Sequence, residues 1–490
     1  MKQTAVSTDG PVRNYVGGEW TDIESDDGQP VYNPATGEQL SHVAFSTPEA
    51  VDDAVSTAQR AFESWGSLPV EERIQPLFRL KALLEEHQDE LTRLLVTEHG
   101  KTYKEASGEI RRGIENVEVA CGIPSMMQAG HLPNAAPGID ETAVRKPLGV
   151  FTAITPFNFP AMIPLWFLPY AVATGNTFIL KPSEKVPLTA QYIVELADEA
   201  GFPDGVVNLV NGGKETVGAL LEHEGIAGVS FVGSTPVARI IYETAAKNGK
   251  RVQAQGGAKN YVAVSDSADL EFAAEKVFSA ACACAGERCL ALDVVVVHED
   301  VYDEFADLIV EQAERAVLGD GLEDDTDIGA LITAEHEQNV REFVETGIEE
   351  GATLLRDGRE DTVDGREDGN FLGPTVFGDV TSEMVVAQEE IFGPVVGLAR
   401  ASDFDEAIET VNATRFGNAA SVFTERGGEA RQFRMEVDAG NVGVNVGTVA
   451  PMAFFHFGGR KDSFFGDLHA QGEDAIHFYT DKTIYVERWP

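Results

Sequence analysis

The first quarter of the chain carries apolar residues at helical spacing. Pro48 stands near the start of the first such stretch, where its fixed φ favours an opening helical turn. The same spacing predicts two further amphipathic helices over residues 73–98 and 104–121, whereas residues 14–45 predict short strands and turns. The apolar positions of the first helix are Val51, Ala54, Val55, Ala58 and Phe62.

After Pro147 the pattern changes to short apolar runs separated by helical stretches. Strands that alternate with helices predict a parallel sheet, so the expected fold class is α/β. A second α/β segment follows over residues 258–460. In such sheets, ligands bind at the carboxyl ends of the strands. The predicted strands cover residues 149–154, 177–181, 206–210, 228–232 and 261–264.

Two apolar stretches need separate interpretation. Residues 161–180 are long enough to cross a membrane, but two prolines and the pair Gly175-Asn176 interrupt them. We therefore expect a buried helix, a turn and a buried strand there, and no membrane partner. The last twenty residues, including 476–479 and 484–486, alternate like an exposed strand. Such a strand usually pairs with another edge, which favours a homo-oligomer.

The chain is strongly acidic. It contains 81 Asp and Glu residues against 37 Lys and Arg residues, a formal net charge of −44. This charge indicates a solvated surface or, alternatively, a binding site for a cationic partner. Like charges repel in dilute buffer and salt shortens the range of that repulsion, so we hypothesise a high-salt cytoplasm. Nucleic acid is not an expected partner because no basic stripe is present. The acidic residues 357–369 predict a surface loop.

The four cysteines predict reduced thiols in a cytoplasmic protein. Cys121 stands alone. Cys282, Cys284 and Cys289 cluster, but their spacing lacks the paired ligands of a zinc site, so no metal is expected. Residues 1–10 contain no apolar segment and are not expected to be a secretory signal.

Cys289 is the candidate nucleophile. It follows the polar, turn-like sequence Gly-Glu-Arg, in which the Arg288 guanidinium would favour the thiolate. A lone cysteine is more often a small core residue, so the chemistry alone leaves both interpretations open. Cys282 and Cys284 lie in an alanine-rich stretch, and we assign both to packing.

Three further motifs follow predicted strands. Asn158 is either a turn residue that caps the next helix or an amide donor to an oxyanion. Lys181 and Glu184 either occupy a surface turn or bind the hydroxyls of an adenine ribose, where the carboxylate would favour NAD over NADP. Gly233-Ser234 opens a helix and is either a plain turn or, through Ser234 and free backbone N–H groups, a pyrophosphate site.

Together these residues resemble the aldehyde dehydrogenase superfamily over nearly the whole chain. Within it, the chain is most similar to the CoA-acylating methylmalonate-semialdehyde dehydrogenases, on residues 112–118, 257–260, 286–289, 451–455 and 461–470. The residues that carry the wider resemblance, in the order and spacing of the family, are Asn158, Lys181, Glu184, Gly233-Ser234, Cys289, Glu390 and Phe392.

The resemblance implies roles for single residues. Cys289 would be the nucleophile, with Asn158 and the Cys289 backbone N–H as donors to the oxyanion. Arg112 and Arg288 would hold a substrate carboxylate, although Arg288 alternatively only lowers the pKa of Cys289 or pairs with a nearby acid. The residues implied in binding NAD are Thr155, Phe157, Lys181, Ser183, Glu184, Gly233, Ser234, Glu390 and Phe392.

One position distinguishes two branches of this superfamily. Hydrolytic members carry Glu-Leu-Gly-Gly-Lys, whose glutamate activates water, whereas this chain has Gln255-Gly256-Gly257-Ala258-Lys259. An amide cannot accept a proton near neutral pH, and a thiol ionises far more easily than water. We therefore expect coenzyme A as the acyl acceptor.

The expected activity is oxidation of methylmalonate or malonate semialdehyde through a Cys289 thioester, with decarboxylation and transfer to CoA as propionyl-CoA or acetyl-CoA. Three alternatives remain open. The first is a hydrolytic NAD(P)-dependent dehydrogenase, for instance of 2-oxoglutarate semialdehyde. The second is a non-catalytic cofactor-binding scaffold. The third is a cysteine hydrolase without redox chemistry.

The resemblance also implies how the chain is divided. A Rossmann-type NAD-binding domain would comprise residues 1–123 and 148–257, and an α/β catalytic domain residues 258–460. Residues 124–147 and 470–490 would form a small oligomerisation β-element. The expected assembly is a dimer of dimers.

The charge predicts a measurable dependence on salt. Thermal stability and activity should both rise from dilute buffer to molar KCl, because the added ions screen repulsion among the acidic side chains. Melting temperatures and initial rates across a KCl series test this. Full stability and full activity without added salt would contradict the high-salt hypothesis.

Overall fold

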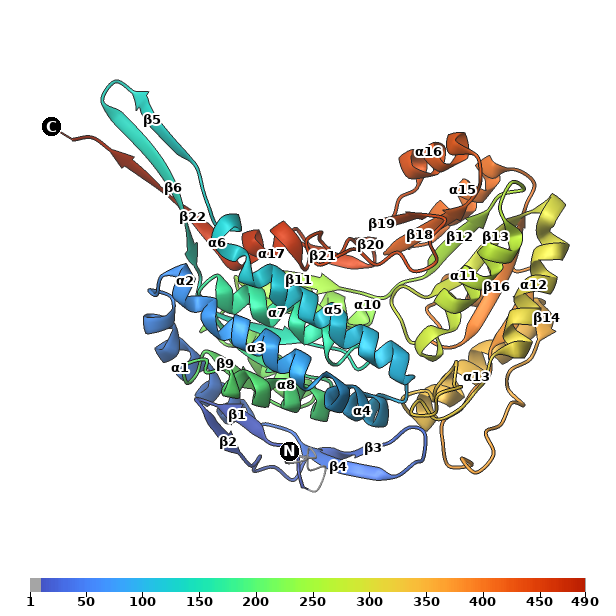
Figure 1. Cartoon of the computed structure of the whole chain (residues 1–490), viewed down its shortest axis with the longest axis horizontal. Coiled ribbons are helices and arrows are strands. Elements are labelled where there is room, and N and C mark those ends of the chain that lie inside the picture. Colours follow the sequence, from blue (N-terminus) through green and yellow to red (C-terminus); the bar gives the residue numbers. More distant parts are fainter. Residues whose placement is uncertain (1–9, 490) are drawn as a thin grey trace.

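Two large sheets covered by helices, together with a projecting ribbon, organise the chain (Figure 1). The computed structural model describes residues 10–489. The expected lack of a secretory signal in the first ten residues therefore falls almost wholly outside the described part. The α/β class predicted from the sequence is confirmed by the parallel strands of both large sheets.

The first sheet has eight strands in the order β2-β1-β9-β8-β7-β10-β11-β21. Its central strands run parallel, and β7 and β8 are buried along their whole length. The apolar runs predicted four of the five parallel strands. They did not predict β11, whose mixture of Arg, Gln, Val and Ala carries no clear apolar run. The strands are β1 (Asn14–Val16), β2 (Glu19–Thr21), β7 (Val150–Ile154), β8 (Thr177–Lys181), β9 (Val207–Leu209), β10 (Ile226–Val232), β11 (Arg251–Gln255) and β21 (Phe464–Gly466).

Helices cover both faces of this sheet. The predicted helix over 73–98 is wrong in one respect, because it is two helices that meet at His87. The His87 ring lies 2.9 Å from the Tyr192 hydroxyl, a tertiary contact that apolar spacing cannot reveal. The helices are α1 (Pro48–Trp65), α2 (Val70–Arg73), α3 (Gln75–Glu86), α4 (Gln88–His99), α5 (Tyr103–Cys121), α6 (Ile123–Met126), α7 (Met162–Ala173), α8 (Pro187–Glu199), α9 (Lys214–Glu222) and α10 (Thr235–Lys247).

The apolar stretch 161–180 forms buried helix α7, a turn and buried strand β8, as predicted. Among residues 10–489, no helix is both long and apolar enough to span a membrane.

The second sheet has seven strands in the order β14-β15-β16-β13-β12-β18-β19 and encloses a separate core. Its strands are β12 (Asn260–Val264), β13 (Leu292–His298), β14 (Thr353–Arg356), β15 (Thr375–Gly378), β16 (Val395–Ala401), β18 (Ala419–Phe423) and β19 (Asn441–Val444). Its helices are α11 (Leu270–Cys282), α12 (Tyr302–Arg315), α13 (Ala334–Glu349), α14 (Val385–Gln388), α15 (Phe404–Ala413) and α16 (Gly427–Glu436). Residues 357–369 form no helix or strand, which confirms the predicted loop.

A three-stranded antiparallel ribbon projects from the body, with β6 in its centre (Figure 1). Residues 484–486 lie in its strand β22, as expected of an exposed strand. The prediction for 476–479 is wrong, because these residues belong to helix α17 and pack against α7. The apolar residues of α17 lie on several sides of the helix, so along the sequence they alternate with polar residues as they would in a strand. The elements are β5 (His131–Ala136), β6 (Ile139–Pro147), β22 (Thr480–Glu487) and α17 (Gly472–Tyr479). Two smaller pairs are β3 (Gly28–Tyr32) with β4 (Gln39–Ala44), and β17 (Phe416–Gly417) with β20 (Arg460–Lys461).

The register of the first sheet decides where its motifs meet. Ile154 at the end of β7 pairs with Lys181 at the end of β8, and Val232 of β10 pairs with Gln255 of β11. The carboxyl ends of these four strands therefore share one edge. The segments that follow them carry most of the predicted cofactor residues.

Candidate active site

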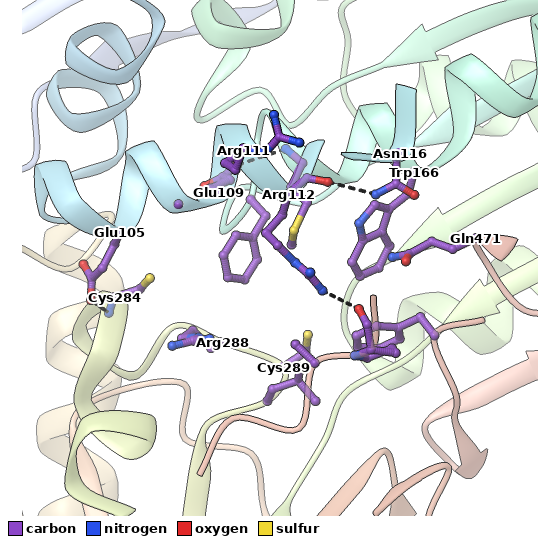
Figure 2. A pocket seen from close by; sticks show the side chains of 17 residues that line it. Glu105, Glu109, Arg111, Arg112, Asn116, Trp166, Cys284, Arg288, Cys289 and Gln471 are labelled. Atoms are coloured by element: carbon purple, nitrogen blue, oxygen red, sulfur yellow. Dashed lines mark hydrogen bonds between the residues drawn. The ribbon is translucent and has the colours of Figure 1, made fainter. Parts of the chain in front are cut away.

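Cys289 lines a cavity of about 450 Å³ whose walls include helices α5 and α7, beside the first sheet, and the turn before β13 of the second sheet (Figure 2). A tight turn presents it: Cys284 and Ala285 have left-handed backbone conformations, each with φ of 52°. Gly286 follows with φ of 78°, and a Cβ there would lie 2.1 Å from the carbonyl oxygen of Gly393. Only glycine fits this close approach, so the Ala-Gly sequence before Cys289 shapes the turn.

The surroundings of Cys289 disfavour the thiolate form of its side chain. Burial raises its pKa to about 12, and the nearby carboxyl group of Glu390 acts in the same direction. Arg288 lowers the pKa, as the sequence predicted, but its effect is smaller than that of burial. Arg288 therefore favours the thiolate, as expected, but its effect on the pKa of Cys289 does not offset the effect of burial.

Two buried asparagines hold the backbone of Cys289. The carbonyl oxygen of Cys289 accepts hydrogen bonds from Asn260 Nδ2 at 2.9 Å and Asn418 Nδ2 at 2.6 Å. Asn260 Nδ2 also donates to Ala291 at 2.7 Å, and its Oδ1 accepts from the Ala419 N–H at 3.0 Å. These bonds fix the orientation of the peptide that carries Cys289. No role was predicted for Asn418, because Cys289, to which it donates, is distant in the chain.

Asn158 does not cap the next helix, so that alternative is excluded. The N-cap residue of α7 is Ala161, and the Asn158 side chain makes no hydrogen bond to the first turn of this helix. Asn158 Nδ2 instead donates to the carbonyl oxygen of Glu287 at 3.0 Å, two residues before Cys289. An amide nitrogen carries two hydrogens, so this bond leaves one for another acceptor.

A buried ion pair fixes the segment that carries Asn158. Lys101 Nζ lies 2.7 Å from Glu109 Oε2, and neither side chain is exposed. The same ammonium group donates to the backbone oxygen of Asn158 at 2.7 Å. Glu109 Oε1 accepts from the N–H groups of Ala161 at 2.8 Å and Met162 at 3.1 Å, at the start of α7. Both ends of the turn after β7 are thereby held.

The predicted adenosine-ribose residues lie together at the sheet edge. The Thr155 N–H donates to the Lys181 carbonyl at 3.0 Å, and Lys181 Nζ lies 3.0 Å from Glu184 Oε2. Burial is the largest single influence on Glu184 and disfavours its ionised form. The charge and hydrogen bond of Lys181, a backbone hydrogen bond and the charge of Lys185 together outweigh it and lower the pKa of Glu184. Ser183 Oγ accepts from the Lys185 N–H at 3.3 Å.

Gly233 and Ser234 form the start of helix α10, as predicted. Ser234 is the N-cap residue, but its hydroxyl makes no capping hydrogen bond. The Gly233 N–H donates to the Gln255 carbonyl at 3.1 Å, and a Cβ at Gly233 would lie 2.5 Å from the Phe231 ring. The Gln255 side chain is buried, and neither its oxygen nor its nitrogen has a partner among the described residues. Polar groups at this edge are therefore available to a ligand.

Glu390 and Phe392, in the loop between α14 and β16 of the second sheet, lie near the same edge. Glu390 Oε1 accepts from the Ala258 N–H at 3.0 Å, and a Cβ at Gly257 would lie 2.4 Å from Glu390 Oε2. Burial raises the pKa of Glu390 to about 8. The Phe392 and Phe157 rings meet edge to face, with centroids 5.8 Å apart.

The two predicted carboxylate-binding arginines both line the cavity with Cys289, but Arg112 is already hydrogen-bonded to other residues and Arg288 is not. Arg112 Nη1 contacts Glu115 Oε2 at 2.8 Å, and its guanidinium also donates to the Pro451 carbonyl oxygen. The Arg288 side chain makes no hydrogen bond or ion pair with the described residues, and its buried Nε lacks a partner. Arg288 does not pair with an acid, which removes one of its alternatives.

The carboxylates that line the cavity are already engaged. Glu105 accepts from the Cys284 N–H at 2.6 Å and, through its other oxygen, from the Thr102 N–H at 3.0 Å. Both oxygens of Glu109 are engaged as described above. No metal-binding group of His, Cys, Asp and Glu occurs within residues 10–489. The chemistry available in the cavity is therefore a thiol with amide and guanidinium donors.

Comparison with known proteins gives concordant results. The model of the aldehyde dehydrogenase family matches residues 20–484. Malonate-semialdehyde dehydrogenase 2 of Bacillus cereus is 49% identical over 479 residues, 98% of each chain. A structure of methylmalonate-semialdehyde dehydrogenase from Oceanimonas doudoroffii is 43% identical, with a TM-score of 0.97, over 98% of this chain and 99% of that one. A structure of a putative methylmalonate-semialdehyde dehydrogenase from Sinorhizobium meliloti complexed with NAD is 41% identical, with a TM-score of 0.96, over 98% of each chain.

The raised pKa of Cys289 predicts how the free enzyme reacts with iodoacetamide. The alkylation rate should rise about tenfold per pH unit from pH 6 to 9, because only the thiolate reacts and its fraction grows at that rate below the pKa. Cys289→Ala is the control, since the other three cysteines are buried. A plateau near neutral pH would show that the thiolate is already formed.

Proposed function

The chain belongs to the aldehyde dehydrogenase family, and from that premise we propose that it oxidises malonate or methylmalonate semialdehyde with NAD and passes the decarboxylated acyl group to coenzyme A. One observation carries this proposal. Cys289 shares its cavity with the unpaired guanidinium of Arg288, while the carboxylates lining that cavity are engaged. The names of the relatives, which specify these two semialdehydes, support it.

The sheet edge fits a dinucleotide. The unbonded Ser234 hydroxyl at the start of α10 suits the pyrophosphate, and Lys181 with Glu184 suits the adenosine ribose. Glu390 lies beside Gly257, where any larger side chain would collide with its carboxyl group, and suits the nicotinamide ribose. NAD bound there supplies the acceptor for the hydride of the aldehyde.

The first bond forms between the Cys289 sulfur and the aldehyde carbon. Once the thiol has lost its proton to solvent, the thiolate attacks and the electron pair of the carbonyl π bond moves to the oxygen, which becomes an oxyanion. The second amide hydrogen of Asn158 and the Cys289 N–H stabilise this oxyanion, at about 3 kcal/mol per donor. Loss of a hydride from the tetrahedral carbon then leaves a thioester on Cys289.

The substrate carboxylate then leaves as CO₂. Arg288, with Arg112 also in the cavity wall, orients that carboxylate. The electron pair of the broken carbon–carbon bond becomes an enolate conjugated with the thioester carbonyl, and the same oxyanion donors stabilise it. Protonation of the enolate carbon gives an acetyl thioester from malonate semialdehyde, or a propionyl thioester from methylmalonate semialdehyde.

Coenzyme A is the acceptor that this site favours. Gln255 cannot deprotonate water, whereas a thiol acceptor ionises without such a base. Overall, malonate semialdehyde, NAD⁺ and CoA give acetyl-CoA, CO₂ and NADH. One observation favours hydrolysis as a second candidate. Glu390 lies close enough to raise the pKa of Cys289, and its own pKa of about 8 would suit a general base.

Rapid-mixing measurements of NADH separate these outcomes. With malonate semialdehyde and no CoA, we expect a burst close to one NADH per site, followed by little turnover, because the thioester persists. Added CoA should give steady turnover and acetyl-CoA. Arg288→Ala should raise the KM for the semialdehyde, since it removes the unpaired cation.

Other results would contradict the proposal in recognisable ways. Steady turnover without CoA that is lost in Glu390→Gln would favour hydrolysis. A complete lack of NADH with every semialdehyde would favour a binding scaffold. Gln255→Glu is the matched variant, and it should increase turnover without CoA because it restores a carboxylate at that position.

We also propose that the ribbon of β5, β6 and β22 joins subunits into a dimer of dimers. Ile484 is 56% exposed and Val486 is 63% exposed, so β22 leaves apolar side chains in water. The four unpaired thiols support a cytoplasmic location. Light scattering on Val486→Asp should show smaller particles than the parent protein. An unchanged mass, or a parent protein that is already a monomer, would contradict this assembly.

A further inference from the structure

Gln471 has a backbone conformation that amino acids other than glycine rarely adopt. Its φ is 71° and its ψ is 171°, a combination found almost only at glycine. The next residue, Gly472, has φ of 56°, and a Cβ there would lie 2.8 Å from the Phe454 carbonyl oxygen. Non-glycine residues in this region persist where the surrounding structure holds them, and they cluster at ligand sites.

Helix capping does not explain a glutamine at this position. Gln471 is the N-cap residue of α17, but its side chain makes no capping hydrogen bond. The backbone carbonyl of Gln471 accepts from the Ala475 N–H at 3.2 Å, and any residue type supplies that group. The residue is only 2% exposed, so its polar side chain is also not a surface feature. The strained backbone therefore places a carboxamide inside the protein without a structural use for it.

The carboxamide faces the cavity that contains Cys289. Gln471 is one of its lining residues, and Figure 2 shows the side chain directed inward beside Trp166. Within residues 10–489, no hydrogen bond uses either the nitrogen or the oxygen of this side chain. Its amide group is thus free to bind a molecule that enters the cavity.

Nearly all other charged or amide side chains of the cavity are occupied. Arg111 Nη2 donates to Glu118 at 2.7 Å. Asn116 donates to the Arg112 carbonyl at 3.0 Å and accepts from the Tyr170 hydroxyl at 3.1 Å. Glu105, Glu109 and Arg112 are engaged as described above. Arg288 and Gln471 are the two that have no partner among the described residues.

We propose that Gln471 is a specificity-determining residue that donates a hydrogen bond from Nε2 to the carboxylate of the substrate. This inference rests on the proposed function and extends it. In the proposed function, Asn158 and the Cys289 N–H donate hydrogen bonds to the aldehyde oxygen. The carboxylate is then the remaining anionic acceptor of the substrate. A neutral amide adds a donor to that carboxylate without a further charge beside the Cys289 sulfur. Arg288 supplies the charge, and Gln471 supplies a second, directional contact.

The test compares malonate semialdehyde with propanal, an aldehyde of the same chain length without the carboxylate. Gln471→Leu should lower kcat/KM for malonate semialdehyde by about 10- to 100-fold, as expected for a lost hydrogen bond to a charged group. The kcat/KM for propanal should change by less than about threefold, because propanal never makes that contact. Gln471→Asn should retain part of the preference, since it keeps the amide one methylene nearer the backbone.

A second measurement tests the strain directly. Gln471→Gly should raise the Tm, because glycine adopts this conformation freely, and it should lose the same preference as Gln471→Leu. A lower Tm for the glycine variant would mean that the side chain packs for stability, which would overturn the inference.

The failure of this inference differs from the failure of the proposed function. If the parent enzyme forms no NADH from malonate semialdehyde, the proposed function is wrong. If the parent enzyme prefers malonate semialdehyde and Gln471→Leu keeps the same ratio of kcat/KM values, only the role of Gln471 is wrong.

Discussion

The buried ion pair of Lys101 and Glu109 is the constraint on which the site depends. Its charged atoms lie 2.7 Å apart and neither side chain is exposed to solvent, so each charge is compensated mainly by the other. Removal of one partner from such a pair typically costs about 3–5 kcal/mol, because the remaining charge is buried without compensation. The pair also anchors backbone groups on both sides of the turn after β7, at Asn158 and at the start of α7. Stability and catalytic geometry thus rest on the same contacts.

From this pair, hydrogen bonds continue from the segments around the first sheet to those around the second. Asn158 donates to the Glu287 carbonyl, two residues before the proposed nucleophile. On the other side, Asn260 and Asn418 hold the carbonyl oxygen of Cys289 itself. Groups from the segments around both large sheets therefore hold the backbone on either side of Cys289. A shift of one sheet against the other would change the position of the sulfur relative to the amide of Asn158, which we propose to stabilise the oxyanion.

The motifs at strand ends could be predicted from the sequence because their relation is local. Lys181 directly ends a strand and Ser234 directly opens a helix, and parallel strands place such segments at one edge. The partners of Cys289 could not be predicted in this way. Asn418 meets it only after the second sheet has formed, and the high pKa of the thiol follows from burial that the local sequence does not encode. No role was predicted for Gln471, because a positive φ at a single glutamine leaves no periodic signal in the sequence.

A double-mutant cycle on the burst of NADH formation tests most directly whether the buried pair acts by holding Asn158. Either Asn158→Ala or Lys101→Met alone should slow the burst by about 100-fold, the typical cost of one lost oxyanion donor. If Lys101 acts through Asn158, the two changes together should slow it hardly more than one alone. Fully multiplicative losses in a folded double mutant would contradict the account, because the two residues would then act independently.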